Sequence, residues 1–128
     1  MQATLKFKVD LFGANVTTIF TDEDDVGLSK LLKKLYKLHG ESHLEDIGAF
    51  DGACFCPDDD IYQYYVIFRI QALSHRLIAH ENEHLKNYIL EKFGCTIKSG
   101  DEELPPSLAE LIAGKTYNFI EKKKLKLH

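Results

Sequence analysis

Residues 61–94, IYQYYVIFRIQALSHRLIAHENEHLKNYILEKFG, decide the fold of this chain. The first part, Ile61 to Ile70, is rich in β-branched and aromatic residues and almost continuously apolar, which indicates a strand covered on both faces. The remainder, from Gln71 to Gly94, has the spacing of one helix of about six turns that ends at a glycine. A buried strand followed by a long helix therefore forms the centre of the predicted domain.

The flanking sequence predicts a hairpin and two further helices. Residues Ala3 to Phe12 and Asn15 to Phe20 alternate apolar and polar side chains around the turn sequence FGAN. The acidic stretch TDEDD then precedes a helix whose leucines recur at helical spacing up to Gly40, so that its apolar stripe is expected to pack against a sheet. A last helix is expected to begin near Ser107, after a pair of prolines.

These elements predict the α+β class and a single domain over residues 1–128. A short strand is also expected at GACFC, within the loop-like sequence from Glu41 to Asp60. The predicted architecture is a small twisted sheet of three to four strands packed with three helices, in the order strand, strand, helix, strand, helix, helix.

The composition is that of an ordinary soluble globular protein. The 128 residues are 45% hydrophobic and 28% charged, and the net charge of −4 argues against a nucleic-acid partner. Charges interrupt every apolar run before the roughly 20 residues that a membrane span needs, and the alternating N-terminus does not resemble a leader. Three cysteines do not make a disulfide framework, so we expect a cytoplasmic protein. The oligomeric state is left open.

The sequence HENEH, residues 80–84, is the motif that carries chemistry. His80 and His84 are four residues apart, so their imidazoles project from one helix face, about 6 Å apart along the axis, and can reach one ion. Zinc binds imidazole nitrogen at about 2.0–2.1 Å. Glu81 lies about 100° round the helix, where its carboxylate can take a proton from a metal-activated water. This is the HExxH arrangement.

The surroundings of Glu81 favour a metal site over a solvated helix face. Its helical neighbours Leu77, Leu85 and Tyr88 form an apolar stripe, where an ordinary surface glutamate is not expected. A buried carboxylate without a partner is costly, and a metal-bound water would be such a partner. The alternative, a solvated helix with two incidental histidines, explains Glu83 well and Glu81 badly.

HENEH, followed by a helix that ends in glycine and a later helix that bears a glutamate, resembles the zincin metallopeptidases, in particular the gluzincin type. The order of elements is also similar to that of small zincin-like proteins of phages and mobile elements. The resemblance implies that His80 and His84 bind zinc and that Glu81 is the general base. It also implies that the strand within Ile61 to Ile70 pairs with a peptide or protein substrate in extended form.

A catalytic zinc takes a third protein ligand and keeps one position open. The candidate is Glu110, 26 residues after His84, because the small residues Ala113 and Gly114 would let its helix pack close beside the motif helix. The alternative role of Glu110 is a first-turn carboxylate stabilised by the helix dipole. Rival ligands in the preceding loop are Asp101, Glu102 and Glu103. The family often has Asp four residues after this glutamate, where this chain has Gly114.

Two further positions depart from the family pattern. Glu83 stands between Glu81 and the second histidine, where the family has uncharged residues, and Lys86 stands where an apolar residue is usual. The predicted function is zinc-dependent hydrolysis of peptide bonds. The alternatives are a catalytically inactive zincin-like interaction or assembly module, and a peptidase that cuts one regulatory partner.

Other candidate groups are weaker. Tyr117, two turns after Glu110, could polarise a substrate carbonyl or could be an ordinary half-buried tyrosine. Cys54 and Cys56 would share one face of a strand and are expected to be small apolar residues rather than zinc ligands. His75 points about 140° away from His80, which excludes it from the same ion. No function is expected for His39, His43 or the PDDD sequence.

Overall fold

The computed structural model describes residues 1–38, 51–57, 60–94 and 104–128. Its elements, in chain order, are β1 (Gln2–Val9), β2 (Ala14–Thr21), α1 (Asp25–Leu38), β3 (Gly52–Phe55), β4 (Gln63–Arg69), a 3₁₀ turn (Ile70–Ala72), α2 (His75–Lys92) and α3 (Leu104–Lys122). Four strands and three α-helices confirm the predicted α+β class. No helix in these ranges is long and apolar enough to cross a membrane.

The four strands form one mixed sheet in the order β1-β2-β4-β3. The β1/β2 and β3/β4 pairs are antiparallel, whereas β2 and β4 run parallel. The predicted hairpin is confirmed, and its turn places Gly13 at a φ of 67°, a left-handed conformation that glycine adopts without strain. The short strand predicted at GACFC is also confirmed, as β3.

β4 is the buried strand that the sequence predicts, because its five central residues, 64–68, are all buried. It also lies inside the sheet, hydrogen-bonded to β2 along one side and to β3 along the other. A strand with both sides paired has no free backbone groups for a peptide. The expectation that the strand within Ile61 to Ile70 pairs with substrate is therefore wrong, and the outer strand on that side of the described sheet is β3.

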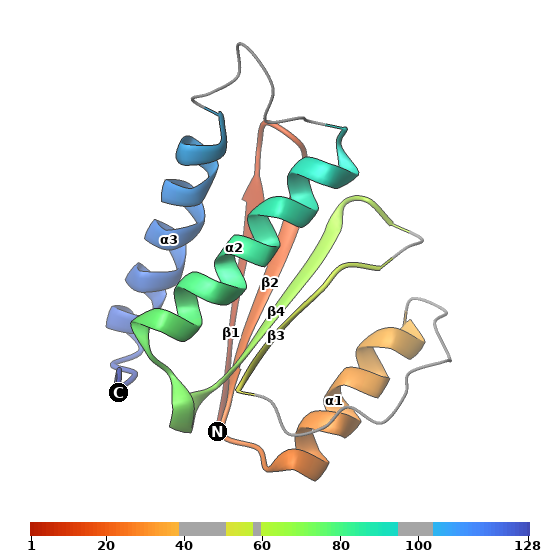
Figure 1. Ribbon diagram of the computed structural model, residues 1–128. Helices are drawn as coiled ribbons and strands as arrows, with labels where there is room; N and C mark the ends of the chain where they lie inside the picture. The colour runs from red at the N-terminus through yellow and green to blue at the C-terminus, as the bar shows by residue number, and fades with distance from the viewer. Residues whose placement is uncertain (39–50, 58–59, 95–103) are drawn as a thin grey trace.

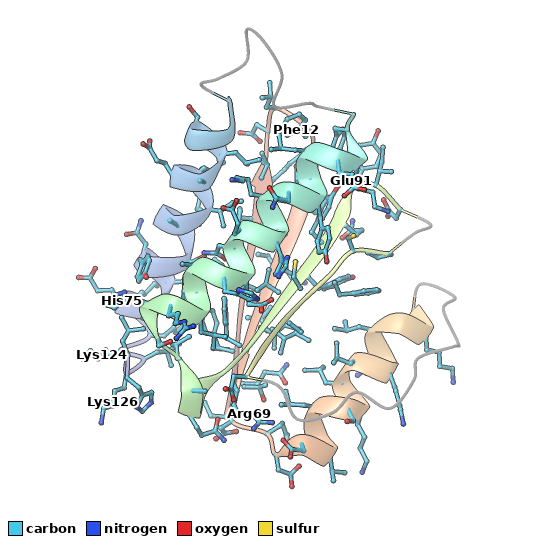
Figure 2. All side chains as sticks on the ribbon, in the orientation of Figure 1. Phe12, Arg69, His75, Glu91, Lys124 and Lys126 are labelled. Carbon is cyan, nitrogen blue, oxygen red and sulfur yellow. The ribbon has the colours of Figure 1, made fainter. Side chains whose placement is uncertain are left out.

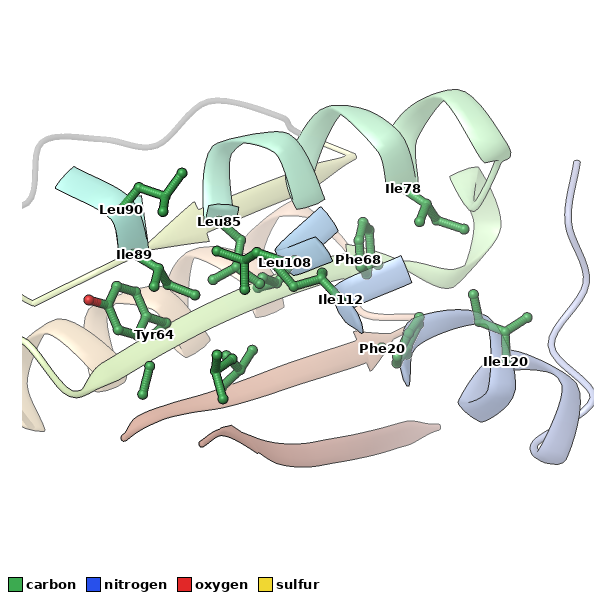
Figure 3. Close-up of a cluster of buried hydrophobic side chains, with 14 of the residues drawn as sticks. Phe20, Tyr64, Phe68, Ile78, Leu85, Ile89, Leu90, Leu108, Ile112 and Ile120 are labelled. Carbon is green, nitrogen blue, oxygen red and sulfur yellow. The ribbon is translucent and has the colours of Figure 1, made fainter. Parts of the chain in front are cut away.

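The helices cover the two faces of the sheet unequally (Figure 1). α2 and α3 pack together over one face, and the main core lies between them and the strands (Figure 3). α1 lies on the opposite face, where Leu28 and Leu32 pack against Ile19 and Ile67. The predicted packing of the α1 leucines against a sheet is thus confirmed. Gly40, the predicted end of this helix, is outside the described residues.

α2 begins later than the sequence predicts. The Ser74 hydroxyl accepts a hydrogen bond from the Leu77 backbone N–H at 3.1 Å, so Ser74 is the N-cap and the helix begins at His75 rather than at Gln71. The predicted end is confirmed, since Gly94 has a φ of 69° directly after the last turn. α3 begins at Leu104 instead of near Ser107, because prolines fit within the first helical turn.

Candidate metal centre

α2 fixes the positions of His80, Glu81 and His84 by burying the opposite side of the helix. Ile78, Leu85 and Ile89 are at most 1% exposed and face the sheet. Because the helix turns about 100° per residue, this anchoring turns His80 and His84 away from the core. Both histidines are exposed, and the side chain of His80 is 64% accessible to solvent. The predicted imidazole pair is therefore formed, and it is open to solvent.

The two imidazoles converge on one point. Their Nε2 atoms are 3.2 Å apart, and the ring planes are nearly perpendicular, at 87°. Two nitrogens bound about 2.0–2.1 Å from one tetrahedral ion lie roughly 3.3–3.4 Å apart, so the observed separation fits a shared zinc ion. Without metal, the same contact is a hydrogen bond when one ring carries its proton on Nε2.

Glu81 is buried beside this pair. The residue is 6% exposed, and its Oε1 lies 3.8 Å from Nε2 of His80. Burial raises the pKa of the Glu81 carboxyl above its ordinary value, while His80 and His84 act in the opposite direction. The prediction that this glutamate emerges from an apolar stripe is confirmed. A carboxyl in this environment holds a proton more firmly than a surface glutamate does.

The outer strand β3 packs directly against Glu81. A Cβ atom built on Gly52 would lie 3.0 Å from Cγ of Glu81, so the β3 backbone and this side chain are in close contact. Burial raises the pKa of the Cys54 thiol, and the Glu81 carboxylate and Cys56 add to that rise. Cys54 and Cys56 are both half-buried against the main core, which agrees with their predicted role as small apolar residues.

The structure does not bring Tyr117 to the histidine pair. α3 packs on the side of α2 that carries Ala79 and Asn82, about 100–160° round the helix from His80 and His84. The Tyr117 hydroxyl lies 2.8 Å from Nδ1 of His75, which Figure 2 shows at the N-terminal end of α2, on the side nearest α3. His75 thus points away from His80, as predicted.

Glu110 is an exposed residue of α3. Ala113 lines a cavity between α2 and α3, and the space around Gly114 is open. Within the described ranges, no three His, Cys, Asp or Glu side chains gather closely enough to hold an ion, so Glu110 does not join the histidine pair there. The rival ligands Asp101, Glu102 and Glu103, and also His39 and His43, lie outside the described residues.

Sequence reasoning missed two features of the site. A cavity of about 270 Å³ lies beside His80 between the start of β3 and the start of α2, and its lining includes Asp51, Ser74 and Arg76. Nothing in the sequence indicates this cavity, because residue 51 is far from residues 74–80 along the chain. The sequence did contain a signal for the contact between Gly52 and Glu81, because a glycine inside a strand often marks the close approach of another group.

Comparison of the chain with family models, with curated proteins and with solved structures gives no match.

Proposed function

We propose that this protein is a zinc-dependent metallopeptidase in which His80 and His84 bind the metal and Glu81 is the general base. The 3.2 Å separation of the two Nε2 atoms, with a buried carboxylate next to them, carries this proposal. A hydrogen bond alone would also join two surface histidines at this distance, but it gives no account of Glu81, whose burial beside the pair costs stability unless the carboxylate has a partner such as a metal-bound water.

The residues of the chain supply the proton chemistry of this reaction. The zinc ion, when bound, lowers the pKa of water and stabilises the negative charge that develops on the substrate oxygen. Glu81 removes a proton from the attacking water and delivers it to the leaving amine. Burial favours the first step, because a carboxyl with a raised pKa is a better proton acceptor.

The proposed substrate is a peptide or protein segment in extended form. β3 supports this proposal because it is the outer strand of the described sheet and packs against Glu81. A peptide added along β3 would lie beside the histidine pair, with backbone hydrogen bonds fixing its register. We also propose a cytoplasmic location and no nucleic-acid partner, from the cysteine content and the net charge.

The third zinc ligand remains a prediction. Glu110, the candidate named from the sequence, does not join the histidine pair within the described ranges, and Asp101, Glu102 and Glu103 are its rivals. Substituting alanine at each of these four positions and measuring zinc affinity separates them, because loss of a third ligand weakens binding far more than loss of a surface carboxylate. Weakened binding in one rival variant, with normal affinity in Glu110→Ala, would assign the site to the segment before α3.

A second candidate function is an interaction module that keeps the fold without catalysis. One observation favours it, namely that the described residues supply two ligand side chains and no third. The exposed Glu83, paired with Lys86 at 2.7 Å, adds a negative charge within the motif, which is unusual for this class of peptidase. A peptidase restricted to one regulatory partner is the remaining alternative.

Hydrolysis of a mixed peptide library tests the proposal. The zinc-loaded protein is expected to cleave extended peptides, and Glu81→Gln is expected to abolish cleavage while zinc stays bound. Glu83→Gln is the matched control, because it removes an exposed carboxylate from the same helix. An intact library with zinc bound would refute a general peptidase and leave the module or the single-partner peptidase. Equal activity in the parent and Glu81→Gln would refute the assigned base.

A further inference from the structure

We propose that Gly52 is a positioning residue for Glu81. Its missing side chain lets the outer strand β3 come close enough to α2 to hold the Glu81 side chain beside His80. This inference rests on the proposed function, because the contact between β3 and α2 affects catalysis only if Glu81 is the general base. The observation behind it is a packing distance that does not depend on bound metal.

The space at Gly52 is tight for any residue that carries a Cβ atom. A Cβ atom there would lie 3.0 Å from Cγ of Glu81, 3.0 Å from Cδ1 of Leu77 and 3.4 Å from the carbonyl oxygen of Ile67. The first two distances are shorter than ordinary contacts between carbon atoms, which are about 3.5–4.0 Å. The Ile67 carbonyl belongs to the central strand β4 and is held by the sheet, so a new methyl group must push the α2 side chains.

Backbone conformation does not explain the glycine. Gly52 is a strand residue and is not among the positive-φ glycines of the described chain, which are Gly13 and Gly94. In a strand, glycine is unfavourable because it loses more conformational freedom than other residues and packs no side chain. Strand propensity therefore fails to account for Gly52, whereas the need for space beside Glu81 and Leu77 does account for it.

The contact controls where the carboxylate lies. Glu81 is enclosed by β3 on one side, and on the other its Oε1 is 3.8 Å from Nε2 of His80. A methyl group at position 52 requires Cγ of Glu81 to move by a few tenths of an ångström, and we expect the attached carboxylate to move with it. His80 and His84 are exposed and are not among the three nearest neighbours of the added atom. Their zinc ligation should persist.

Gly52→Ala tests this inference, with Gly114→Ala as the matched control, because a Cβ at Gly114 meets no atom within 4 Å. Gly52→Ala is expected to keep the zinc content of the parent and its KM, and to lose about 10- to 100-fold in kcat, the range expected when a catalytic group is displaced by up to about 1 Å. Gly114→Ala is expected to match the parent. Unchanged kcat in Gly52→Ala would overturn the positioning role.

A double variant guards against a folding defect. Leu77→Ala removes one of the two close contacts, so Gly52→Ala with Leu77→Ala relieves strain while the added methyl still presses on Glu81. Its kcat is expected to stay as low as that of Gly52→Ala, whereas Leu77→Ala alone should be close to the parent. Full recovery in the double variant would show that Leu77, and not Glu81, transmits the effect, and would overturn the inference.

Crystal structures of the zinc-free parent and of zinc-free Gly52→Ala supply a readout besides activity. The distance from Oε1 of Glu81 to Nε2 of His80, 3.8 Å in the parent, is expected to change in the variant. If the parent hydrolyses no peptide, the proposed function fails, and this distance alone then decides the inference. An unmoved Glu81 would overturn the positioning role whatever the activity.

Discussion

Replacing Glu81 with glutamine should stabilise the metal-free protein at alkaline pH. The carboxyl is 6% exposed, and its contact with Nε2 of His80, at 3.8 Å, is longer than a hydrogen bond. Burial costs more for a carboxylate than for an amide, because the desolvation penalty of about 1–3 kcal/mol for a neutral polar group is larger when the group is charged. Glutamine has the same shape and no charge. We therefore expect the free energy of unfolding to rise by about 1–3 kcal/mol at about pH 8.

The pKa of Glu81 determines how the free energy of unfolding changes with pH. Burial raises the pKa of Glu81 in the folded chain above its value in the unfolded chain, so the folded chain binds the proton more tightly. The parent should therefore lose stability as the pH rises from the ordinary glutamate pKa, about 4.3, through the raised folded value. Each unit of difference between the two pKa values corresponds to about 1.4 kcal/mol. Glu81→Gln should lack this loss, so that the two proteins converge near pH 4.

Urea unfolding in the presence of a chelator measures this difference. With an m-value of about 1–3 kcal/mol/M, a difference of 1–3 kcal/mol moves the urea midpoint by roughly 1 M. Glu83→Gln is the control, because the Glu83 side chain is 57% exposed and its substitution should change stability by less than about 0.5 kcal/mol. A Glu81→Gln protein that is less stable than the parent at pH 8 would refute the reasoning, since it would show that the ionised carboxylate has a stabilising partner.

Three other variants test the fold around the site by urea unfolding and elemental analysis. Tyr117→Phe breaks the 2.8 Å hydrogen bond with His75 and should cost about 0.5–1.5 kcal/mol with unchanged zinc content; loss of zinc would contradict the placement of Tyr117 away from the metal. Ser74→Ala removes the N-cap of α2 and should cost about 1 kcal/mol, and a neutral result would count against Ser74 as the start of that helix. Leu85→Ala should cost about 2–5 kcal/mol because the side chain is 0% exposed, and a cost below 1 kcal/mol would show that α2 does not pack as described.

Local patterns predicted the elements of this fold well. Periodicity and turn residues predict the hairpin, β4 and the three helices. These signals depend on residues only a few positions apart in the sequence, so they can be recognised without knowledge of the tertiary structure. The order of the strands does not follow from these signals, because pairing between β3 and β4 and between β2 and β4 depends on contacts across the whole domain. The expectation that β4 pairs with substrate was wrong because the local signals did not show that β4 is paired on both sides.

In the candidate site, too, local spacing predicts the contacts within one helix and does not predict those between helices. His80, Glu81 and His84 lie on one helix, so a spacing of four residues is enough to bring the imidazoles together. The side of α2 on which α3 packs is set by tertiary contacts such as the Asn82–Thr116 hydrogen bond, and the spacing of Glu110 from His84 holds no information on it.

Zinc content of the purified protein, measured by elemental analysis beside three histidine variants, tests the central claim most directly. The account predicts one zinc per chain in the parent, loss of zinc in His80→Ala and in His84→Ala, and full zinc content in His75→Ala, whose ring lies on another side of the same helix. A parent that binds no zinc at neutral pH, or a His80→Ala variant that keeps it, would contradict the metal centre.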